Sequence, residues 1–221
     1  MAPLLGHHPV GASTGYMVAN RGNWLALVEE ASRVSSFAVE LTALGEDELP
    51  ALVRFLEGEP SLPFRYVSVH GPSKARRMPE EELISQLAGL PAFIDAIVLH
   101  PDQMDDPALY ASLGSRLLVE NMDSRKEAGK NADELTKIFE KLPDAGFCFD
   151  IAHAWTVDPT MGVGEDLLDR FAGRLKHVHL SSISDSLEHV PLSEEQEELF
   201  MSLLSRCRDV PWILEAEPPK R

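Results

Sequence analysis

The feature that most constrains the fold is a series of short apolar runs separated by segments of helical periodicity. Each run is rich in Val, Ile, Leu or Phe and has the length of a buried strand. The runs cover residues 37–44, 64–70, 95–100, 116–121, 146–153, 175–181 and 210–217, with a weaker candidate at 3–11. Apolar residues recur at helical spacing over 24–34, 46–56, 79–90, 131–142 and 193–207.

Strands that alternate with helices pair in parallel through right-handed crossovers. Eight such units predict an α/β fold, the (β/α)8 or TIM barrel. We expect one domain over residues 1–221, because no Gly/Ser-rich or Pro-rich linker divides the chain. The sequence after the last run is too short for an eighth outer helix, so we expect a compact barrel without it. An apolar groove left there would favour a homo-oligomer.

The charge of the chain limits its partners. Its 36 acidic and 20 basic residues give a formal net charge of -16, which makes nucleic acid and anionic membranes unlikely partners and favours a small-molecule substrate. The two cysteines, Cys148 and Cys207, lie in segments that read as buried, which predicts free thiols and a reducing compartment. No apolar run has the length of a membrane span, so we expect a cytoplasmic protein.

Six successive apolar runs end in a histidine or a carboxylate. The residues are His70, His100, Glu120, Asp150 with His153, His179 and Glu215. In a parallel barrel these strand ends meet at the open end where chemistry takes place. So many unpaired ionisable groups are costly to desolvate together, and a divalent cation would offset that cost. Imidazole nitrogen and carboxylate oxygen suit Zn, Mn, Fe or Co.

Several of these segments also carry a family resemblance. The series "VSVHGP", "IVLHPD", "LLVENM", "FDIAHAW", "HVHLS", "EHVPL" and "ILEAEP" resembles the xylose isomerase-like TIM barrels of AP endonuclease family 2. That group contains sugar isomerases and epimerases together with endonuclease IV. The resemblance covers about residues 64–218, and it implies a metal-dependent enzyme built on this barrel.

The resemblance implies a site for one to three ions. The central ion would be held by Glu120, Asp150, His179 and Glu215. A second ion would be held by His70 and His100, with Glu120 as the bridging ligand.

The set of ligands for a third ion is incomplete in this sequence. His153 and His189 match two of its ligands, or they contact the substrate instead. The remaining ligand position is Leu187, which cannot bind a metal, so Glu188 or Asp185 would have to substitute.

Other polar residues leave alternatives open. His177 has the parity of His179 but lies one layer deeper, which favours a structural role. His7 and His8 flank the first strand, and either a place at the barrel mouth or an ordinary terminal position is consistent with that. Trp155 and Phe149 could stack on a sugar or belong to the core.

Two basic segments follow strands at the predicted mouth. "SKARR" (73–77) contains Lys74, and "DSRKEAGK" (123–130) contains Arg125 and Lys126. These three side chains could bind a phosphate or carboxylate of the substrate, or lie in solvated loops.

The sequence favours a metal-dependent isomerase or epimerase of a small sugar, sugar phosphate or related hydroxy-ketone. Glu120 and Glu215 would transfer the proton between them, and His153 would hydrogen-bond a substrate oxygen. The alternatives are a polynuclear metallohydrolase of the endonuclease IV type acting on small phosphodiesters, an iron-dependent oxidase, and a barrel that binds its ligand without turnover.

Overall fold

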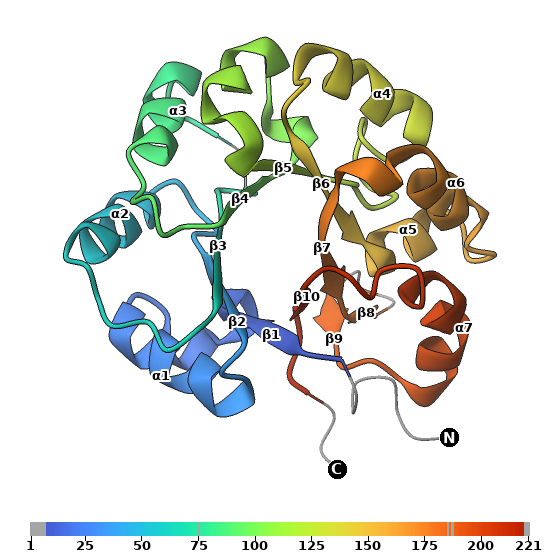
Figure 1. The fold of residues 1–221 in the computed structure, drawn as a ribbon, viewed down its shortest axis with the longest axis horizontal. Helices are drawn as coiled ribbons and strands as arrows, with labels where there is room; N and C mark the ends of the chain where they lie inside the picture. The colour runs from blue at the N-terminus through green and yellow to red at the C-terminus, as the bar shows by residue number, and fades with distance from the viewer. Residues whose placement is uncertain (1–7, 75, 185, 187, 219–221) are drawn as a thin grey trace.

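Eight parallel strands close into a barrel in this computed structural model, which describes residues 8–74, 76–184, 186 and 188–218. The strands are β1 (Val10–Ser13), β2 (Ala38–Thr42), β3 (Tyr66–His70), β4 (Ala96–Leu99), β5 (Leu117–Glu120), β6 (Gly146–Asp150), β7 (Leu175–Leu180) and β10 (Trp212–Leu214). Strand β1 pairs with both β2 and β10 and so closes the ring (Figure 1). The predicted TIM barrel is therefore confirmed.

Seven α-helices lie around the strands in the described part of the chain (Figure 1). They are α1 (Trp24–Val34), α2 (Leu49–Glu57), α3 (Glu80–Ala88), α4 (Ala132–Lys141), α5 (Ile151–Val157), α6 (Gly162–Phe171) and α7 (Glu194–Leu204). The five predicted helical segments correspond to α1–α4 and α7. The crossover from β4 to β5 instead uses the 3-10 helices η4 (Pro101–Gln103) and η5 (Pro107–Arg116).

Two predicted boundaries need correction. The first strand is Val10–Ser13 rather than 3–11. Its Gly11 packs closely between the neighbouring strands, because an added Cβ would lie 2.7 Å from Ala38 Cβ and from Ile213 Cδ1. The apolar run 146–153 is not all strand. Strand β6 ends at Asp150, whose Oδ1 accepts a hydrogen bond from the backbone N–H of His153 and so caps α5.

His8, the first described residue, lies at the end of the barrel opposite to the carboxyl ends of the strands. His8 Nε2 is 3.0 Å from the carbonyl oxygen of Val210, and its ring stacks on Trp212 with centroids 3.8 Å apart. These contacts place His8 at the start of β10, away from the barrel mouth. His7 lies outside the described residues.

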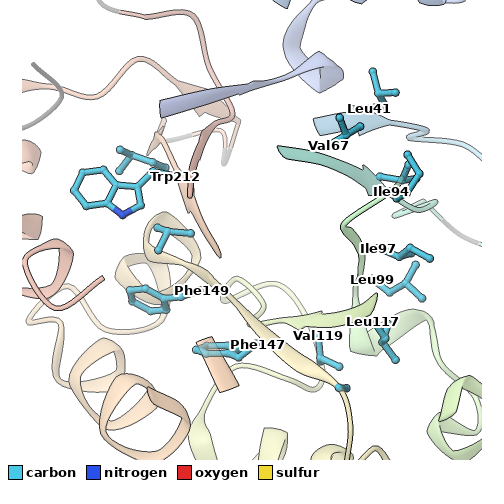
Figure 2. Close-up of a cluster of buried hydrophobic side chains, with 14 of the residues drawn as sticks. Leu41, Val67, Ile94, Ile97, Leu99, Leu117, Val119, Phe147, Phe149 and Trp212 are labelled. Carbon is cyan, nitrogen blue, oxygen red and sulfur yellow. The ribbon is translucent and has the colours of Figure 1, made fainter. Parts of the chain in front are cut away.

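Alternation along the strands separates an apolar layer from a polar interior. Leu117 and Val119 of β5 belong to the hydrophobic core between strands and helices, and Figure 2 shows them on the outer side of the strand. Leu118 belongs to a small cluster inside the barrel, so Glu120 has the parity that faces inward. Phe149 is fully buried in the outer layer and Trp155 packs against that layer, so both belong to the core.

A short antiparallel pair, β8 (Ser182–Ile183) and β9 (His189–Val190), lies between β7 and α7 in the sequence. Within the described residues, which end at Pro218, no helix follows β10. Among all the described residues, no helix has both the length and the apolar character needed to span a membrane. Cys148 and Cys207 are free and buried, as predicted.

Candidate metal centre

The carboxylate of Glu120 lies at the middle of a ring of histidines. Its Oε1 is 3.1 Å from His179 Nδ1 and 3.3 Å from His153 Nδ1. Its Oε2 is 3.2 Å from Nε2 of both His70 and His100. The side chain is only 1 % exposed. The two oxygens therefore face two different sets of donors, which is the geometry of a bridging carboxylate.

The four residues predicted to hold a central ion lie together. One ligand atom from each of Glu120, Asp150, His179 and Glu215 lies within 4.8 Å of the others. Among the described residues, Asp150 Oδ2 and Glu215 Oε2 are buried without a hydrogen-bond partner. Burial and the charges of Asp150 and Glu120 raise the pKa of Glu215, against the lowering effect of His179. Additional positive charge in the cluster would therefore favour the ionised form of Glu215.

The histidines predicted to hold a second ion also converge. His70 Nδ1 is 2.8 Å from the carbonyl oxygen of Gly71, which can only accept, so Nδ1 carries the proton. The lone pair of Nε2 then faces Oε2 of Glu120. That contact is repulsive unless a proton or a cation lies between the two atoms. Burial lowers the pKa of His100, which lies beside the same oxygen, and so favours its neutral, metal-binding form.

A third group combines Asp150, His153 and His189, whose ligand atoms also lie within 4.8 Å of one another. His153 Nδ1 donates to the carbonyl of Asn121 at 2.9 Å, which leaves Nε2 available. His189 Nδ1 is 2.8 Å from Ser181 Oγ. Leu187 and Asp185, on which the prediction for this site depended, lie outside the described residues. Glu188 lines the cavity above the centre.

Sequence reasoning missed one buried carboxylate, Glu40, in the middle of β2. Its two oxygens are each 3.2 Å from His179 Nε2, and Ser68 Oγ donates to Oε2 at 3.0 Å. Burial opposes ionisation, but the charge and hydrogen bond of His179 and the charge of His70 outweigh it and lower the pKa of Glu40 to about 2. The sequence signal that could have revealed it is that Glu40 is a single acidic residue inside an apolar run. Its position in the alternation along the strand directs its side chain to the barrel interior.

His177 lies below His179 in the barrel. It has no exposed surface, its Nδ1 is 3.0 Å from Tyr66 Oη, and its Nε2 is 3.2 Å from His179 Nε2. Burial and the charge of His179 lower the pKa of His177 to about 3, so the ring is neutral. This environment agrees with the structural role expected for it.

A cavity of about 660 Å³ lies above the centre, and its wall includes His70, His100, Glu120, His153, His189 and Glu215. The three predicted anion-binding residues, Lys74, Arg125 and Lys126, also line it.

Two of these cations already have partners. Arg125 bonds both oxygens of Asp123, at 3.0 and 2.9 Å, and Lys126 Nζ is 2.7 Å from Asp102 Oδ2. Lys74 is exposed and makes no ion pair with the residues that the structure describes. The cavity therefore offers one uncommitted cation from this predicted set.

The closed parallel barrel defines the class of TIM barrels, and the histidines and carboxylates at the carboxyl ends of its strands form groups that could hold a metal ion. Residues 107–221, just over half of the chain, match the family model of the xylose isomerase-like TIM barrel. The chain belongs to this family, which confirms the resemblance seen in the sequence. Among functionally curated proteins, no sequence matches significantly.

Solved structures share the fold over nearly the whole chain. Endonuclease IV from Thermus thermophilus is 22 % identical with a TM-score of 0.59, covering 96 % of this chain and 93 % of that one. An L-ribulose 3-epimerase is 11 % identical with a TM-score of 0.58, covering 96 % and 82 %. The 3-keto-D-glucoside 4-epimerase from E. coli is 12 % identical with a TM-score of 0.55, covering 97 % and 94 %. The same fold thus occurs in an endonuclease and in sugar epimerases.

Proposed function

We propose that this protein is a divalent-metal-dependent isomerase or epimerase of a small sugar or related hydroxy-ketone. The observation that carries the proposal is the position of Glu215 at the floor of the cavity. Its side chain is 14 % exposed, its Oε1 is 3.4 Å from His179 Nδ1, and its Oε2 is 3.3 Å from His189 Nδ1. A carboxylate that touches both the metal-ligand cluster and the cavity can reach a substrate bound there.

The donor set fits a divalent ion. The ligand atoms are carboxylate oxygens and imidazole nitrogens, which Zn, Mn, Fe and Co accept. When bound, the ion would polarise a substrate carbonyl and acidify the neighbouring carbon-bound proton.

The chain's own residues would move that proton. Glu215, which lines the cavity, removes it, and Glu120 is the opposing carboxylate that returns it. Glu120 is the more buried of the two, because its side chain is 1 % exposed and that of Glu215 is 14 % exposed. His153 lines the cavity with Nε2 available, so it would hydrogen-bond a substrate oxygen.

The charges around the cavity support a substrate with little charge. Asp123 and Asp102 neutralise Arg125 and Lys126, which leaves Lys74 as the predicted contact for a single anionic group. A cavity of about 660 Å³ also lies within the ~300–1,000 Å³ usual for small-molecule sites. Sugar epimerases among the similar structures agree with this substrate class.

A second candidate function is hydrolysis of small phosphodiesters by a two-ion centre. The observation that favours it is the convergence of His70 and His100 on Oε2 of Glu120, since a single-ion epimerase does not need these ligands. Paired ions can activate water and stabilise the leaving oxygen. The net charge of -16 opposes binding of long nucleic acids.

The test combines metal analysis with three assays, which follow ketose proton exchange, phosphodiester hydrolysis and oxygen consumption. We expect metal-loaded protein to exchange the carbon-bound proton of a ketose for deuterium in D₂O, followed by NMR across a panel of free and phosphorylated ketoses. Glu215→Gln should lose the exchange. Glu217→Gln, the same substitution at an exposed position two residues later, should keep it.

Three results would overturn the isomerase proposal. These are full exchange in Glu215→Gln, release of nitrophenol from bis(p-nitrophenyl) phosphate without ketose exchange, and oxygen consumption by an iron-loaded protein. Loss of phosphodiesterase activity in His70→Ala, with one ion fewer per chain, would identify the hydrolase.

A further inference from the structure

The two ring nitrogens of His179 face carboxylates on opposite sides. Nδ1 is 3.1 Å from Glu120 Oε1 and 3.4 Å from Glu215 Oε1, on the side of the cavity. Nε2 is 3.2 Å from both oxygens of Glu40, on the side of the barrel interior. The side chains of His179 and Glu40 have no exposed surface, so these contacts are shielded from bulk solvent.

The neighbours of Nε2 determine where the proton of His179 must lie. A carboxylate accepts hydrogen bonds and donates none, so a lone pair on Nε2 would face the charge of Glu40. The nearby Nε2 of His177, at 3.2 Å, can also accept when the ring proton of His177 lies on Nδ1, which is 3.0 Å from Tyr66 Oη. A proton on Nε2 of His179 satisfies both neighbours. The lone pair of Nδ1 then faces the central metal-ligand group.

We propose that Glu40 is a positioning residue for the metal centre. By accepting the Nε2–H of His179, it selects the tautomer and ring orientation that present Nδ1 to the ion. Such outer carboxylates orient a ligating histidine and increase its basicity. The inference rests on the metal centre of the proposed function and not on the reaction.

A different role for the same residues is a second, deeper ion. Ligand atoms of Cys148, His177 and His179 lie within 4.8 Å of one another, and Glu40 lies beside them. All four side chains are fully buried. An ion there would require His179 to lose the protons of both nitrogens, since Nδ1 already faces the central group. The hydrogen-bonded arrangement accounts for the same contacts without that requirement.

The first experiment measures Zn²⁺ or Co²⁺ affinity of the full chain by competition with a chromophoric chelator. Glu40→Met keeps the approximate volume and removes the acceptor, so we expect the Kd to weaken by ~10–100-fold. Glu40→Gln keeps a neutral acceptor and should give a smaller loss. Tyr66→Phe is the matched control, because it breaks the same buried network at His177 without contacting His179. The metal Kd of Tyr66→Phe should stay within about twofold of the wild-type value. Glu40→Met should weaken the Kd much more, because it removes the residue that hydrogen-bonds a metal-ligating histidine.

The second experiment needs no variant at Glu40. Long-range ¹⁵N–¹H correlation spectra of the zinc-loaded wild type should show His179 protonated on Nε2, with its signal assigned by its absence from His179→Gln. This measurement decides the question if Glu40→Met fails to fold.

Three outcomes would overturn the inference. One is a folded Glu40→Met protein with wild-type metal affinity, and another is a wild-type His179 protonated on Nδ1. The third is a chelator-resistant ion that is lost in Cys148→Ser. Metal affinity that depends on Glu40 in a protein without ketose turnover would uphold the inference while rejecting the isomerase.

Discussion

His179 Nδ1 lies 3.1 Å from Oε1 of Glu120, although 59 positions separate the two residues in the chain. Glu120 ends β5 and His179 lies near the end of β7, on either side of β6. The strand register places Glu120 opposite Cys148, and Asp150 opposite His179. Glu120 is thus two positions before the Asp150–His179 pair in register, and the parallel strands bring all three proposed ligands to the carboxyl end of the barrel.

Removal of bound metal should destabilise the protein, because Asp150, Glu120 and Glu215 would then repel one another. An ion present at a thousand times its Kd contributes ~4 kcal/mol to the free energy of unfolding. We expect thermal melts to show a lower Tm after chelator dialysis and recovery after Zn²⁺, Mn²⁺ or Co²⁺ is added. A Tm unaffected by both treatments would contradict a metal centre formed by these residues.

Replacement of the two stacked histidines should have different effects. His179→Ala should lose the central ion, because it removes the Nδ1 that contacts both Glu120 and Glu215. His177→Ala should keep the ion but lose ~1–3 kcal/mol of stability, since it leaves the hydroxyl of Tyr66 without this partner. Metal analysis after dialysis and urea unfolding distinguish the two. Retention of the ion in His179→Ala would reject this ligand assignment.

Lys74 should affect only charged substrates. Lys74→Ala should raise the KM for a phosphorylated ketose by about tenfold, as expected for loss of an exposed charge-assisted bond worth ~1.5 kcal/mol. The KM for the free ketose should not change. Arg125→Ala should have a smaller effect, because its guanidinium is already paired with Asp123. Equal effects of Lys74→Ala on both substrates would show that the lysine does not contact the anion.

Gly129 should be required in the loop that carries Arg125 and Lys126. Its φ is +84°, and an added Cβ would lie 2.5 Å from Pro101 Cγ. Gly129→Ala should therefore lower the free energy of unfolding by ~1–3 kcal/mol. Gly173→Ala is the control, since a Cβ there meets nothing within 4 Å, and it should change stability by less than ~0.5 kcal/mol. Similar denaturation midpoints for both variants would refute the expected strain.

Most of the barrel could be predicted from the sequence because each strand has its own apolar signal. The alternation of runs and helices predicted the parallel order, and the last residues of the runs predicted which side chains meet. The meeting of these side chains could be predicted because the carboxyl ends of parallel strands all lie on one side of the barrel. Helices α5 and α6 were missed, and the run 146–153 was read as all strand, because capping of α5 by Asp150 is a local contact that apolar content does not reveal.

The sequence by itself determined the barrel and the set of polar residues at its open end, because both follow from periodicity along one chain. Only the tertiary structure decided which partners those residues have. Glu40 contacts His179 across 139 positions, and Lys126 pairs with Asp102 through loops from different strands. Such pairings depend on strand register and loop path, which arise when distant segments pack together.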